Sequence, residues 1–360
     1  MQVSSKPVFL LIAVTALLVI NSCEKDDPAP EIKGYAKGVF IRCEGSFQAN
    51  NGSVSWYDTD SARIVNNLFS SVNGRPAGDV VQSFALAGDY GVIVANNSQK
   101  IEVVDLETFE STATITGFTY PRYFQYSGNG TGYLSNGSFG GQVYKIDLHQ
   151  GVVTDTIEVG MGPEQMVISG NHLFVANSGG WGYDNTVSVV DIQNNQVVNT
   201  IEAGDIPVAL VSDRHDNIWV LCRGKEVYND TWTEVIDETD SKLVRINSAA
   251  MTVDKEIIIG QQGDGFSPSW LTINPGGDIL YYGEADGLYQ MSINGSQQPE
   301  EPFISELFSA AGIHPQSGEL FALKQGDYVS PGELYIYDTE NNLVSAYDTG
   351  LAPGGIVFAD

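Results

Sequence analysis

The stretch from Pro163 to Gly204, PEQMVISGNHLFVANSGGWGYDNTVSVVDIQNNQVVNTIEAG, decides the fold. It contains four segments in which apolar and polar residues alternate, PEQMVIS, NHLFVAN, NTVSVVD and NQVVNTIEAG, and Gly, Asn and Asp occupy the junctions. Alternation with a period of two is typical of β-strands, and Gly, Asn and Asp favour turns. The stretch is therefore expected to form a four-stranded antiparallel unit.

The third strand of this unit recurs seven times, always as an alternating apolar segment that ends on a small polar residue. The copies are VSWYD (54–58), IEVVD (101–105), VYKID (143–147), VSVVD (187–191), LVRIN (243–247), LYQMS (288–292) and LYIYD (334–338). They end 47, 42, 44, 56, 45 and 46 residues apart. A four-stranded repeat of this length is the size of one propeller blade. We therefore predict an all-β, seven-bladed β-propeller of four-stranded antiparallel blades.

The two ends of the repeat region predict how the ring closes. The segment PGGIVF (353–358) reads as a first strand without its successors, whereas GVFIRCEG (38–45) matches a second strand and its following loop. One blade is thus expected to combine a C-terminal inner strand with three N-terminal strands. Such closure removes exposed sheet edges, which otherwise favour aggregation.

The N-terminus reads as a targeting segment, residues 1–22. Lys6 precedes an apolar run, Val8–Ile20, that suits a signal peptide and is too short to span a bilayer. The run ends at Ile20-Asn21-Ser22-Cys23, which resembles a bacterial lipobox with Cys23 as the lipidated residue, and the acidic residues after it are similar to the surface-export tag of Bacteroidetes lipoproteins. An ordinary cleaved signal peptide with an incidental cysteine is the alternative. We expect a lipidated tether at 23–36, a propeller at 37–360, and a lipid anchor in the outer membrane with exposure at the cell surface.

The charge balance restricts the partners. The chain has 17 Lys and Arg against 45 Asp and Glu, a formal net charge of −28. Nucleic-acid binding requires Lys and Arg to neutralise phosphates, so we expect no nucleic-acid partner. Contact with anionic membranes is likewise expected only through the lipid anchor.

The sequence contains no motif that points to catalysis or to a metal site. Its four histidines lie in different blades, and no Cys and His spacing resembles a zinc site. The aspartates that end the repeated strands occupy a turn position where Asp binds backbone N–H groups, so a structural role is expected for Asp58, Asp105, Asp147, Asp191 and Asp338. Cys43 and Cys222 end equivalent strands of distant blades and are expected to be buried free thiols. No catalytic residue, metal or cofactor is predicted.

The candidate site is one face of the ring. If strands A to D run outward from the axis, the B–C and D–A loops share a face, and these loops carry aromatic and arginine side chains, the types that dominate binding hot spots. The candidates are Arg75, Tyr120, Arg122, Phe139, Trp181, Tyr183, Arg223, Tyr228, Trp232, Trp270 and Tyr328. The alternative is that some rings, Phe47 and Phe139 in particular, turn inward and fill the loops. Amides nearby, Gln82, Asn136 and Asn177, could supply hydrogen bonds.

The fifth blade contains the longest interruption of the repeat, RGKEVYNDTWTEVIDETDS between Cys222 and Lys242. Long loops in compact repeats tend to be binding loops or lids. We expect this insertion to fold over the candidate face and to wall a pocket.

The repeat TVSVVDIQNNQVVNTIEAGDIP, followed by NIWVLC, resembles the YncE-like, YVTN-repeat propellers over residues 38–360. Together with the lipobox-like segment, it is similar to surface lipoproteins of Bacteroidetes, some of which capture cobalamin for a TonB-dependent outer-membrane transporter. The resemblance implies capture of a nutrient, a corrinoid or similar metal complex, without catalysis. Two other functions stay open: a protein-interaction or cell-envelope scaffold that uses the same face, and an enzyme such as a lactonase or quinoprotein-like hydrolase.

Overall fold

The computed structural model describes Met1 and residues 34–231, 233–260 and 268–359. Within these residues the chain forms 29 strands and a single short helix, α1 (Leu68–Asn73). The expected signal peptide, Cys23 and most of the expected tether lie outside the described residues. In the part of the chain that the structure describes, no helix is long and apolar enough to cross a bilayer. The predicted all-β class is confirmed.

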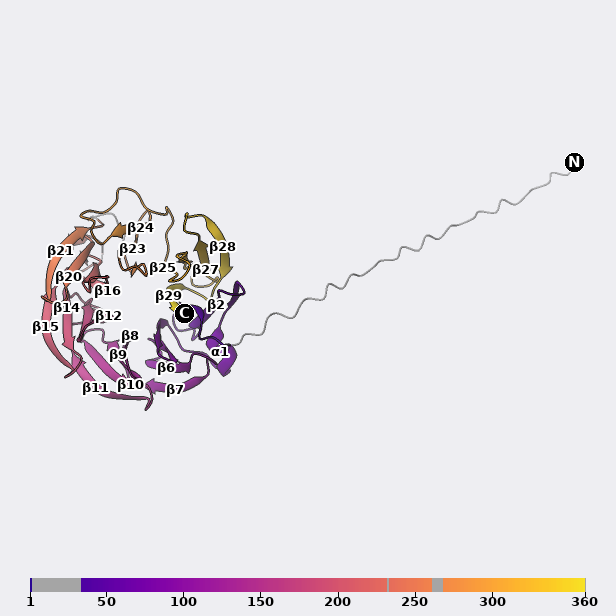
Figure 1. Cartoon of the computed structure of the whole chain (residues 1–360), viewed down its shortest axis with the longest axis horizontal. Helices are drawn as coiled ribbons and strands as arrows, with labels where there is room; N and C mark the ends of the chain where they lie inside the picture. Colours follow the sequence, from indigo (N-terminus) through magenta and orange to yellow (C-terminus); the bar gives the residue numbers. More distant parts are fainter. Residues whose placement is uncertain (2–33, 232, 261–267, 360) are drawn as a thin grey trace. The chain divides into compact units, whose positions relative to one another are not determined.

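The first four blades are four-stranded antiparallel sheets arranged around a common axis (Figure 1). From the axis outward, their strands are β29 (Pro353–Ala359), β1 (Gly38–Cys43), β2 (Ser53–Asp58) and β3 (Arg63–Val65); β4 (Val81–Ala87), β5 (Tyr90–Ala95), β6 (Lys100–Asp105) and β7 (Ser111–Thr116); β8 (Pro121–Gly128), β9 (Thr131–Asn136), β10 (Gln142–Asp147) and β11 (Val152–Glu158); β12 (Pro163–Ser169), β13 (His172–Asn177), β14 (Thr186–Asp191) and β15 (Gln196–Glu202).

Three further blades complete the ring, and the fifth carries an additional hairpin. The fifth blade consists of β16 (Pro207–Ser212), β17 (Ile218–Cys222), β20 (Lys242–Asn247) and β21 (Thr252–Ile258), and its hairpin of β18 (Glu226–Tyr228) and β19 (Val235–Glu238). The sixth blade consists of β22 (Leu271–Ile273), β23 (Ile279–Glu284) and β24 (Gly287–Ser292). The seventh blade consists of β25 (Ala310–Ile313), β26 (Leu320–Lys324), β27 (Glu333–Tyr337) and β28 (Leu343–Asp348). The predicted seven-bladed propeller is confirmed.

The sixth blade is shorter than predicted, because it has three strands in the described residues. Between β24 and β25, the described chain pairs with this sheet through an isolated bridge between Leu288 and Ile304 rather than through a regular strand. The sequence here lacks apolar alternation and contains Pro299 and Pro302, which cannot donate hydrogen bonds to a ladder. A regular outer strand therefore does not form.

The ring closes through the predicted composite blade. Strand β1 pairs with β2 on one side and with β29 on the other, where Val39 lies opposite Phe358. The inner strands contact one another in the order β4, β8, β12, β16, β22, β25, β29, and β29 contacts β4. Closure by the C-terminal strand is confirmed.

The hydrophobic core lies between neighbouring blades. One cluster, for example, joins Phe174 and Val189 of the fourth blade to Val220 and Ile246 of the fifth. Each blade buries both faces, so the alternating residues of its strands pack either forward or backward around the ring. The core thus holds adjacent blades in place and leaves the axial ends of the strands to the loops.

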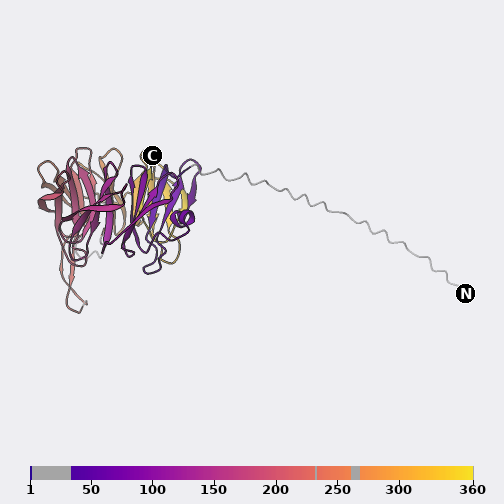
Figure 2. The same ribbon diagram turned by 90° about the horizontal axis from the view of Figure 1, so that it is seen from below.

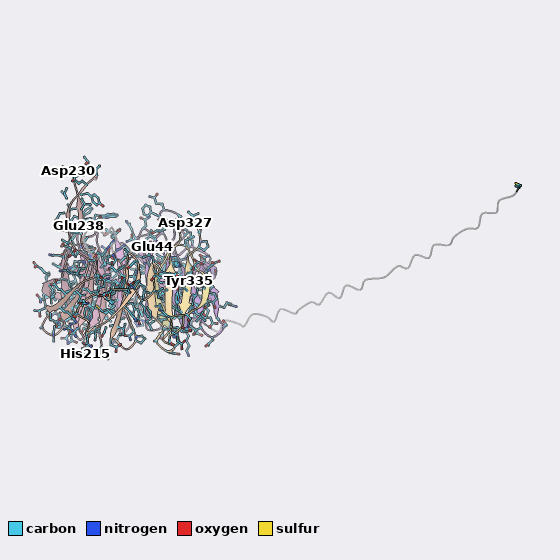
Figure 3. The ribbon with its side chains drawn as sticks, turned by 90° about the horizontal axis from the view of Figure 1, so that it is seen from above. Glu44, His215, Asp230, Glu238, Asp327 and Tyr335 are labelled. Carbon is cyan, nitrogen blue, oxygen red and sulfur yellow. The ribbon has the colours of Figure 1, made fainter. Side chains whose placement is uncertain are left out.

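The two faces of the ring are distinct. Figure 3 shows Glu44, Glu238 and Asp327 on one face and His215 on the opposite face. We call the first of these the loop face; it is formed by the B–C and D–A loops of the blades. The hairpin β18–β19 projects from this face, with Asp230 near its tip (Figures 2 and 3).

The residues predicted to be structural have that role. Each aspartate that ends a repeated strand accepts a hydrogen bond from a backbone N–H of the following turn, as in Asp191 with Gln193 and Asp338 with Glu340. The same contact occurs at Asp58, Asp105 and Asp147. Cys43 and Cys222 are buried free thiols, as predicted.

Candidate functional site

A cavity of about 460 Å³ opens on the loop face at the axis of the ring. We call it the central cavity. All seven blades contribute side chains or backbone at, or one or two residues before, the beginning of their inner strands: Gln82, Arg122, Glu164, Val208, Ser269, Ser309 and Gly354. The cavity is therefore built from one repeated position of the fold, and its chemistry is set by what each repeat places there.

A proline fixes this position in five blades. Pro121, Pro163, Pro207, Pro268 and Pro353 directly precede Arg122, Glu164, Val208, Ser269 and Gly354. Proline suits the start of an innermost strand, because that strand has no neighbour on the axial side to receive its N–H. In several blades the strand pairing also shifts just after the proline, for example between Pro163 and Met166. Such bulges redirect side chains, and they coincide here with the residues that line the cavity.

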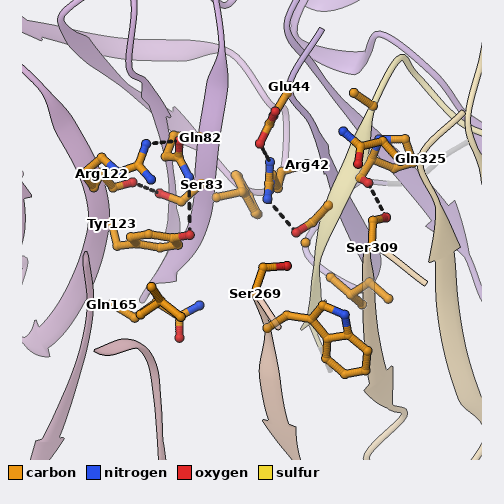
Figure 4. A pocket seen from close by; sticks show the side chains of 18 of the residues that line it. Arg42, Glu44, Gln82, Ser83, Arg122, Tyr123, Gln165, Ser269, Ser309 and Gln325 are labelled. Atoms are coloured by element: carbon orange, nitrogen blue, oxygen red, sulfur yellow. Dashed lines mark hydrogen bonds and ion pairs between the residues drawn. The ribbon is translucent and has the colours of Figure 1, made fainter. Parts of the chain in front are cut away.

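Arg122 is the centre of a polar network on one side of the cavity (Figure 4). Its Nε donates to both carboxylate oxygens of Glu164, at 3.0 and 3.1 Å, and its Nη2 lies 2.9 Å from Oε1. Its Nη1 donates to Gln82, whose amide nitrogen donates to the Tyr123 hydroxyl at 3.3 Å. Burial acts to lower the pKa of Arg122, but the charge and hydrogen bonds of Glu164 together with the neighbouring Tyr123 and Tyr120 outweigh it and raise the pKa above the ordinary arginine value.

A second arginine lines another part of the central cavity. Arg42 donates from Nη1 to Glu44 at 2.6 Å and from Nη2 to the carbonyl oxygen of Gly354, also at 2.6 Å. Figure 4 shows Ser309 and Gln325 on the far side of the cavity from Arg122. The lining is thus mainly polar, with guanidinium, carboxylate, amide and hydroxyl groups.

A second cavity of about 420 Å³ adjoins the first below the hairpin. We call it the hairpin cavity. The two cavities share Arg122, Glu164, Val208 and Arg223. The base of the hairpin also lines the second cavity, through Lys225, Glu226, Glu238 and Thr239.

Aromatic rings form one wall of the hairpin cavity. The rings of Tyr120 and Trp181 lie 6.0 Å apart, and Cζ of Arg122 lies 5.2 Å from the Tyr120 ring centroid. Trp181 is 67% exposed. The Tyr183 hydroxyl donates to the carbonyl oxygen of Glu226 at 2.7 Å and so connects the fourth blade to the hairpin. Stacking faces and cationic groups therefore lie in one continuous surface.

The structure brings seven of the eleven predicted residues to the two cavities. Tyr120, Arg122, Trp181, Tyr183 and Arg223 line the hairpin cavity, and Trp270 and Tyr328 line the central cavity together with the two arginines. Trp270 differs from the others because it is only 8% exposed and its Nε1 donates to the carbonyl oxygen of Phe308 at 2.9 Å. Its main contribution is packing between the sixth and seventh blades.

Arg75 lies apart from both cavities. Its guanidinium donates to both carboxylate oxygens of Glu102, at 2.7 and 2.9 Å, and stacks on Phe69 with 4.9 Å to the ring centroid. Burial acts to raise the pKa of Glu102, but hydrogen bonds from Arg75, Lys100 and Thr114 together hold it below the ordinary value. Arg75, which follows α1, thus forms a structural ion pair with the second blade.

Three other predicted residues do not line the cavities or cannot be placed. Phe139 is exposed on the loop face and lines neither cavity, and Tyr228 lies on the hairpin, where its hydroxyl donates to Glu226 at 2.8 Å. Trp232 lies outside the described residues. The alternative in which Phe47 and Phe139 fill the loops is wrong, because these rings are 69% and 71% exposed.

Two of the nearby amides are structural rather than accessible. Asn136 accepts hydrogen bonds from the backbone N–H groups of Thr119 and Tyr120, and Asn177 donates to Thr186 and Ser188. Both side chains are buried at the end of a second strand. Only Gln82 of the three lines the central cavity.

Sequence reasoning missed most polar groups of the central cavity, because it concentrated on loop aromatics. The missed residues are Arg42, Glu44, Tyr123, Glu164, Gln165, Ser269, Ser309 and Gln325. The residue after the recurring proline was a usable signal: alignment of the repeats on that proline places Arg122, Glu164 and Ser269 at one structural position.

The insertion in the fifth blade takes a different course from the one expected. It was expected to fold over the loop face, whereas β18 and β19 form a hairpin that projects away from the ring (Figure 2). Only its base walls a cavity. The strands pair with each other and with no blade, so their hydrogen bonds do not require the hairpin to lie on the ring.

Across the described residues, no group of three or more His, Cys, Asp and Glu side chains is arranged to hold a metal ion. The side chains present can donate and accept hydrogen bonds, pair with charges and stack on flat groups. This chemistry is suited to ligand binding.

These features define a class: a seven-bladed propeller with a polar, arginine-containing cavity at the loop-face end of its axis. The family model described as "Domain of unknown function (DUF5074)" matches residues 37–349, and the chain belongs to this family. A search of curated proteins finds no match.

Solved structures share the fold at low sequence identity. A quinoprotein alcohol dehydrogenase-like protein from Bacteroides thetaiotaomicron aligns with a TM-score of 0.65 and 15% identity, covering 91% of this chain and 79% of that one. Hydrazine synthase from Kuenenia stuttgartiensis aligns with a TM-score of 0.56 and 15% identity, covering 75% and 87%. The dihydro-heme d1 dehydrogenase NirN aligns with a TM-score of 0.58 and 9% identity, covering 92% and 78%. At these identities the similarity establishes the propeller fold alone.

Proposed function

We propose that this chain is a non-enzymatic binding protein that captures a bulky ligand across the central and hairpin cavities. The observation that carries the proposal is that the two cavities adjoin and share Arg122, Glu164, Val208 and Arg223. Each has the size of a small-molecule site, and together they offer a wider platform than a compact metabolite needs. A ligand with several polar arms around a flat centre fits this arrangement best.

A corrinoid such as cobalamin, or a similar metal complex, has that chemistry. Its amide arms could exchange hydrogen bonds with Gln82, Tyr123 and Gln165, and its flat faces could stack near Tyr120 and Trp181. The ligand would bring its own metal, so the protein need provide none. Ligand, location and transporter are parts of one proposal: a surface lipoprotein, lipidated at Cys23 and anchored in the outer membrane, that passes its ligand to a TonB-dependent transporter.

Calorimetric titration of the purified protein with cyanocobalamin tests the capture proposal. We expect saturable heat and a rise in melting temperature at ~100 µM ligand. Trp181→Ala should weaken binding by about 10-fold or more, in line with a stacking contact of 1–3 kcal/mol. Phe139→Ala is the matched control, because that ring is equally exposed on the same face and lines neither cavity. No heat and no thermal shift would rule out the corrinoid.

A second candidate is docking of another protein on the loop face. Outside the outer strands, the exposed large hydrophobic residues of the described propeller all belong to this face or its hairpin: Phe47, Phe139, Trp181, Tyr183, Tyr228, Val235, Ile236, Leu307, Tyr328 and Val329. Exposed apolar groups that gather on one face favour a protein interface. If the partner is a transporter, the protein would both bind the ligand in the cavities and dock the transporter on the loop face. If the protein is a scaffold, it would bind a partner protein on the loop face and no small ligand. In that case Phe139→Ala would weaken partner binding and cyanocobalamin would produce no heat.

A further inference from the structure

We propose that the hairpin cavity binds an uncharged, flat heterocyclic ring, and that Gly180 positions Trp181 as the surface on which this ring stacks. The inference rests on the proposed function and names the chemistry of the part of the ligand that enters the hairpin cavity. Gly180 acts through Trp181 and is therefore a positioning residue.

The charges that line the hairpin cavity balance. The lining cations are Arg122, Arg223 and Lys225, and the lining anions are Glu164, Glu226 and Glu238. Arg122 binds both carboxylate oxygens of Glu164, and Nζ of Lys225 lies 3.0 Å from the carboxylate of Asp237 on the hairpin. The chain as a whole, with a formal net charge of −28, repels anions in addition. A charged ligand would therefore find no excess of opposite charge in the cavity to compensate the loss of its hydration.

Neutral polar groups can still form hydrogen bonds with this lining. A guanidinium has five N–H donors and a carboxylate has about four acceptor positions, so Arg122 and Glu164 are not saturated by their own pairing. The hydroxyls of Thr239 and Ser241 also line the cavity; they donate to Asp205 and to the carbonyl oxygen of Arg223, and each keeps acceptor capacity. The ring nitrogens and carbonyl groups at the edge of a heterocycle match this mixture of donors and acceptors.

Trp181 offers an accessible ring on a loop that is held by its neighbours. Its side chain is exposed, and its ring centroid lies 6.0 Å from that of Tyr120. The backbone N–H of Trp181 donates to the carbonyl oxygen of Ser138 at 3.1 Å, and that of Gly179 donates to the carbonyl oxygen of Met161 at 2.8 Å. The loop after β13 is thereby bonded to the loops that follow β9 and β11. A ring held in this way can stack on a ligand without a large ordering cost.

Gly180 permits the close approach of these loops. Its φ of 59° lies in the left-handed region, and a side chain there would collide with the carbonyl oxygen of Ser138, the group that accepts from Trp181. Gly162 on the third loop is equally confined, because a side chain at that position would collide with the backbone nitrogen of Gly180. A larger residue at Gly180 must therefore separate the loops and displace Trp181.

Riboflavin and flavin mononucleotide test the inference with the purified protein. Both have the same flat heterocycle and polyhydroxyl arm, and they differ only in a terminal phosphate. We expect riboflavin to bind with saturable quenching of its fluorescence, because an indole ring stacked on a flavin quenches it. We expect flavin mononucleotide to bind about 3-fold or more weakly at low ionic strength, since the chain repels its phosphate. The difference should shrink in ~0.5 M salt, which screens the repulsion.

Variants at Trp181 test the stacking surface. Trp181→Ala should weaken riboflavin binding by about 10-fold or more and reduce the quenching at saturation. Trp181→Phe should restore part of the affinity but not the quenching, because a phenyl ring stacks without the electron-rich indole. Phe139→Ala is the control, since that ring is exposed on the same face and lines neither cavity, and it should bind riboflavin as the unaltered chain does.

A matched pair of glycine variants tests the positioning role. Gly170, in the turn between β12 and β13, has a φ of 57°, so alanine meets similar backbone strain there and at Gly180, but it has no neighbour within 4 Å. Gly180→Ala should weaken riboflavin binding by about 5-fold or more and reduce the quenching at saturation, whereas Gly170→Ala should change neither. Melting temperatures establish that each variant is folded. If Gly180→Ala does not fold, the Trp181 variants still test the stacked ring.

The outcomes distinguish this inference from the proposed function. Absence of riboflavin binding, tighter binding of flavin mononucleotide, or an unchanged riboflavin affinity in folded Trp181→Ala would overturn the uncharged stacked ring, even if cyanocobalamin binds. Equal effects of the two glycine variants would overturn the positioning role of Gly180. Riboflavin binding that depends on Trp181 in a protein without affinity for cyanocobalamin would support the inference and contradict the corrinoid version of capture.

Discussion

Arg122 binds both carboxylate oxygens of Glu164, which lies 42 residues later at the equivalent position of the next inner strand. Each residue directly follows the proline that begins its strand. The ion pair therefore connects the third blade to the fourth at the wall of the central cavity. Two repeats that share one scaffold position have acquired opposite charges there.

This pair should be strongly coupled. Both side chains are mostly buried. Removal of one partner therefore leaves the other charged group buried without the hydrogen bonds that had stabilised it. In a double-mutant cycle with Arg122→Gln and Glu164→Gln, we expect a coupling free energy of about 1–3 kcal/mol in chemical denaturation. The control is the exposed pair Arg214 and Asp278, for which about 0–1 kcal/mol is expected. Equal coupling in the two cycles would contradict the prediction.

The ion pair of Glu102 should make stability dependent on pH. Its folded-state pKa is held below the ordinary value, so the carboxylate contributes stability that is complete above the unfolded pKa of about 4.3. That contribution is lost as the pH falls through the lower folded pKa. We expect Glu102→Gln to reduce the free energy of unfolding most at pH 7 and progressively less below pH ~4, measured by urea denaturation. A deficit that stays constant down to pH ~3 would show that the carboxylate charge is not the cause.

Removal of the hairpin should leave the ring intact. At its base, the Thr239 N–H donates to the carbonyl oxygen of Lys225 at 3.0 Å, so a two-residue Asn-Gly turn can replace 226–238. We expect the melting temperature to change by less than about 3 °C, because β18 and β19 pair only with each other. Ligand affinity should fall, since the base of the hairpin lines its cavity. A large loss of stability would show that the hairpin is part of the core.

The two buried thiols should be unreactive in the folded protein. Burial raises the pKa of Cys222 to about 12 and also raises that of Cys43, so neither forms a thiolate near pH 8. In a Cys23→Ser variant, we expect Ellman's reagent to label neither thiol in buffer and both in denaturant. Rapid labelling of one thiol in buffer would indicate local opening of its blade.

Much of the fold could be predicted from the sequence, because each blade repeats the same strand pattern. The seven copies of the third strand predicted the number of blades, and the aspartates that end five of them, such as Asp105 and Asp191, predicted the turn role. The composite blade also followed from pattern, since PGGIVF is a first strand and GVFIRC a second. The outer part of the sixth blade could not be predicted. The absence of apolar alternation after β24 indicates that no strand forms there, but it does not indicate the path of the chain.

The site was harder to predict, because it depends on contacts between repeats. Aromatic composition selected Trp181 and Tyr183, which are on loops that reach the hairpin cavity. The same criterion selected Phe139, which lines neither cavity although its neighbour Ser138 binds the Trp181 backbone, since composition does not give the direction of a side chain. The ion pair of Arg122 with Glu164 follows from the alignment of neighbouring inner strands, and that becomes clear only once the ring is assembled.

The position of β29 has a consequence for how the protein is made. This strand comes after all other described strands in the sequence, yet it lies innermost in the blade that holds β1. During synthesis, the early blades are available long before residues 353–359 exist, so the first blade remains without its axial strand until these residues have been made. This order delays locking of the ring until the segment that forms β29 has emerged and can pair with β1.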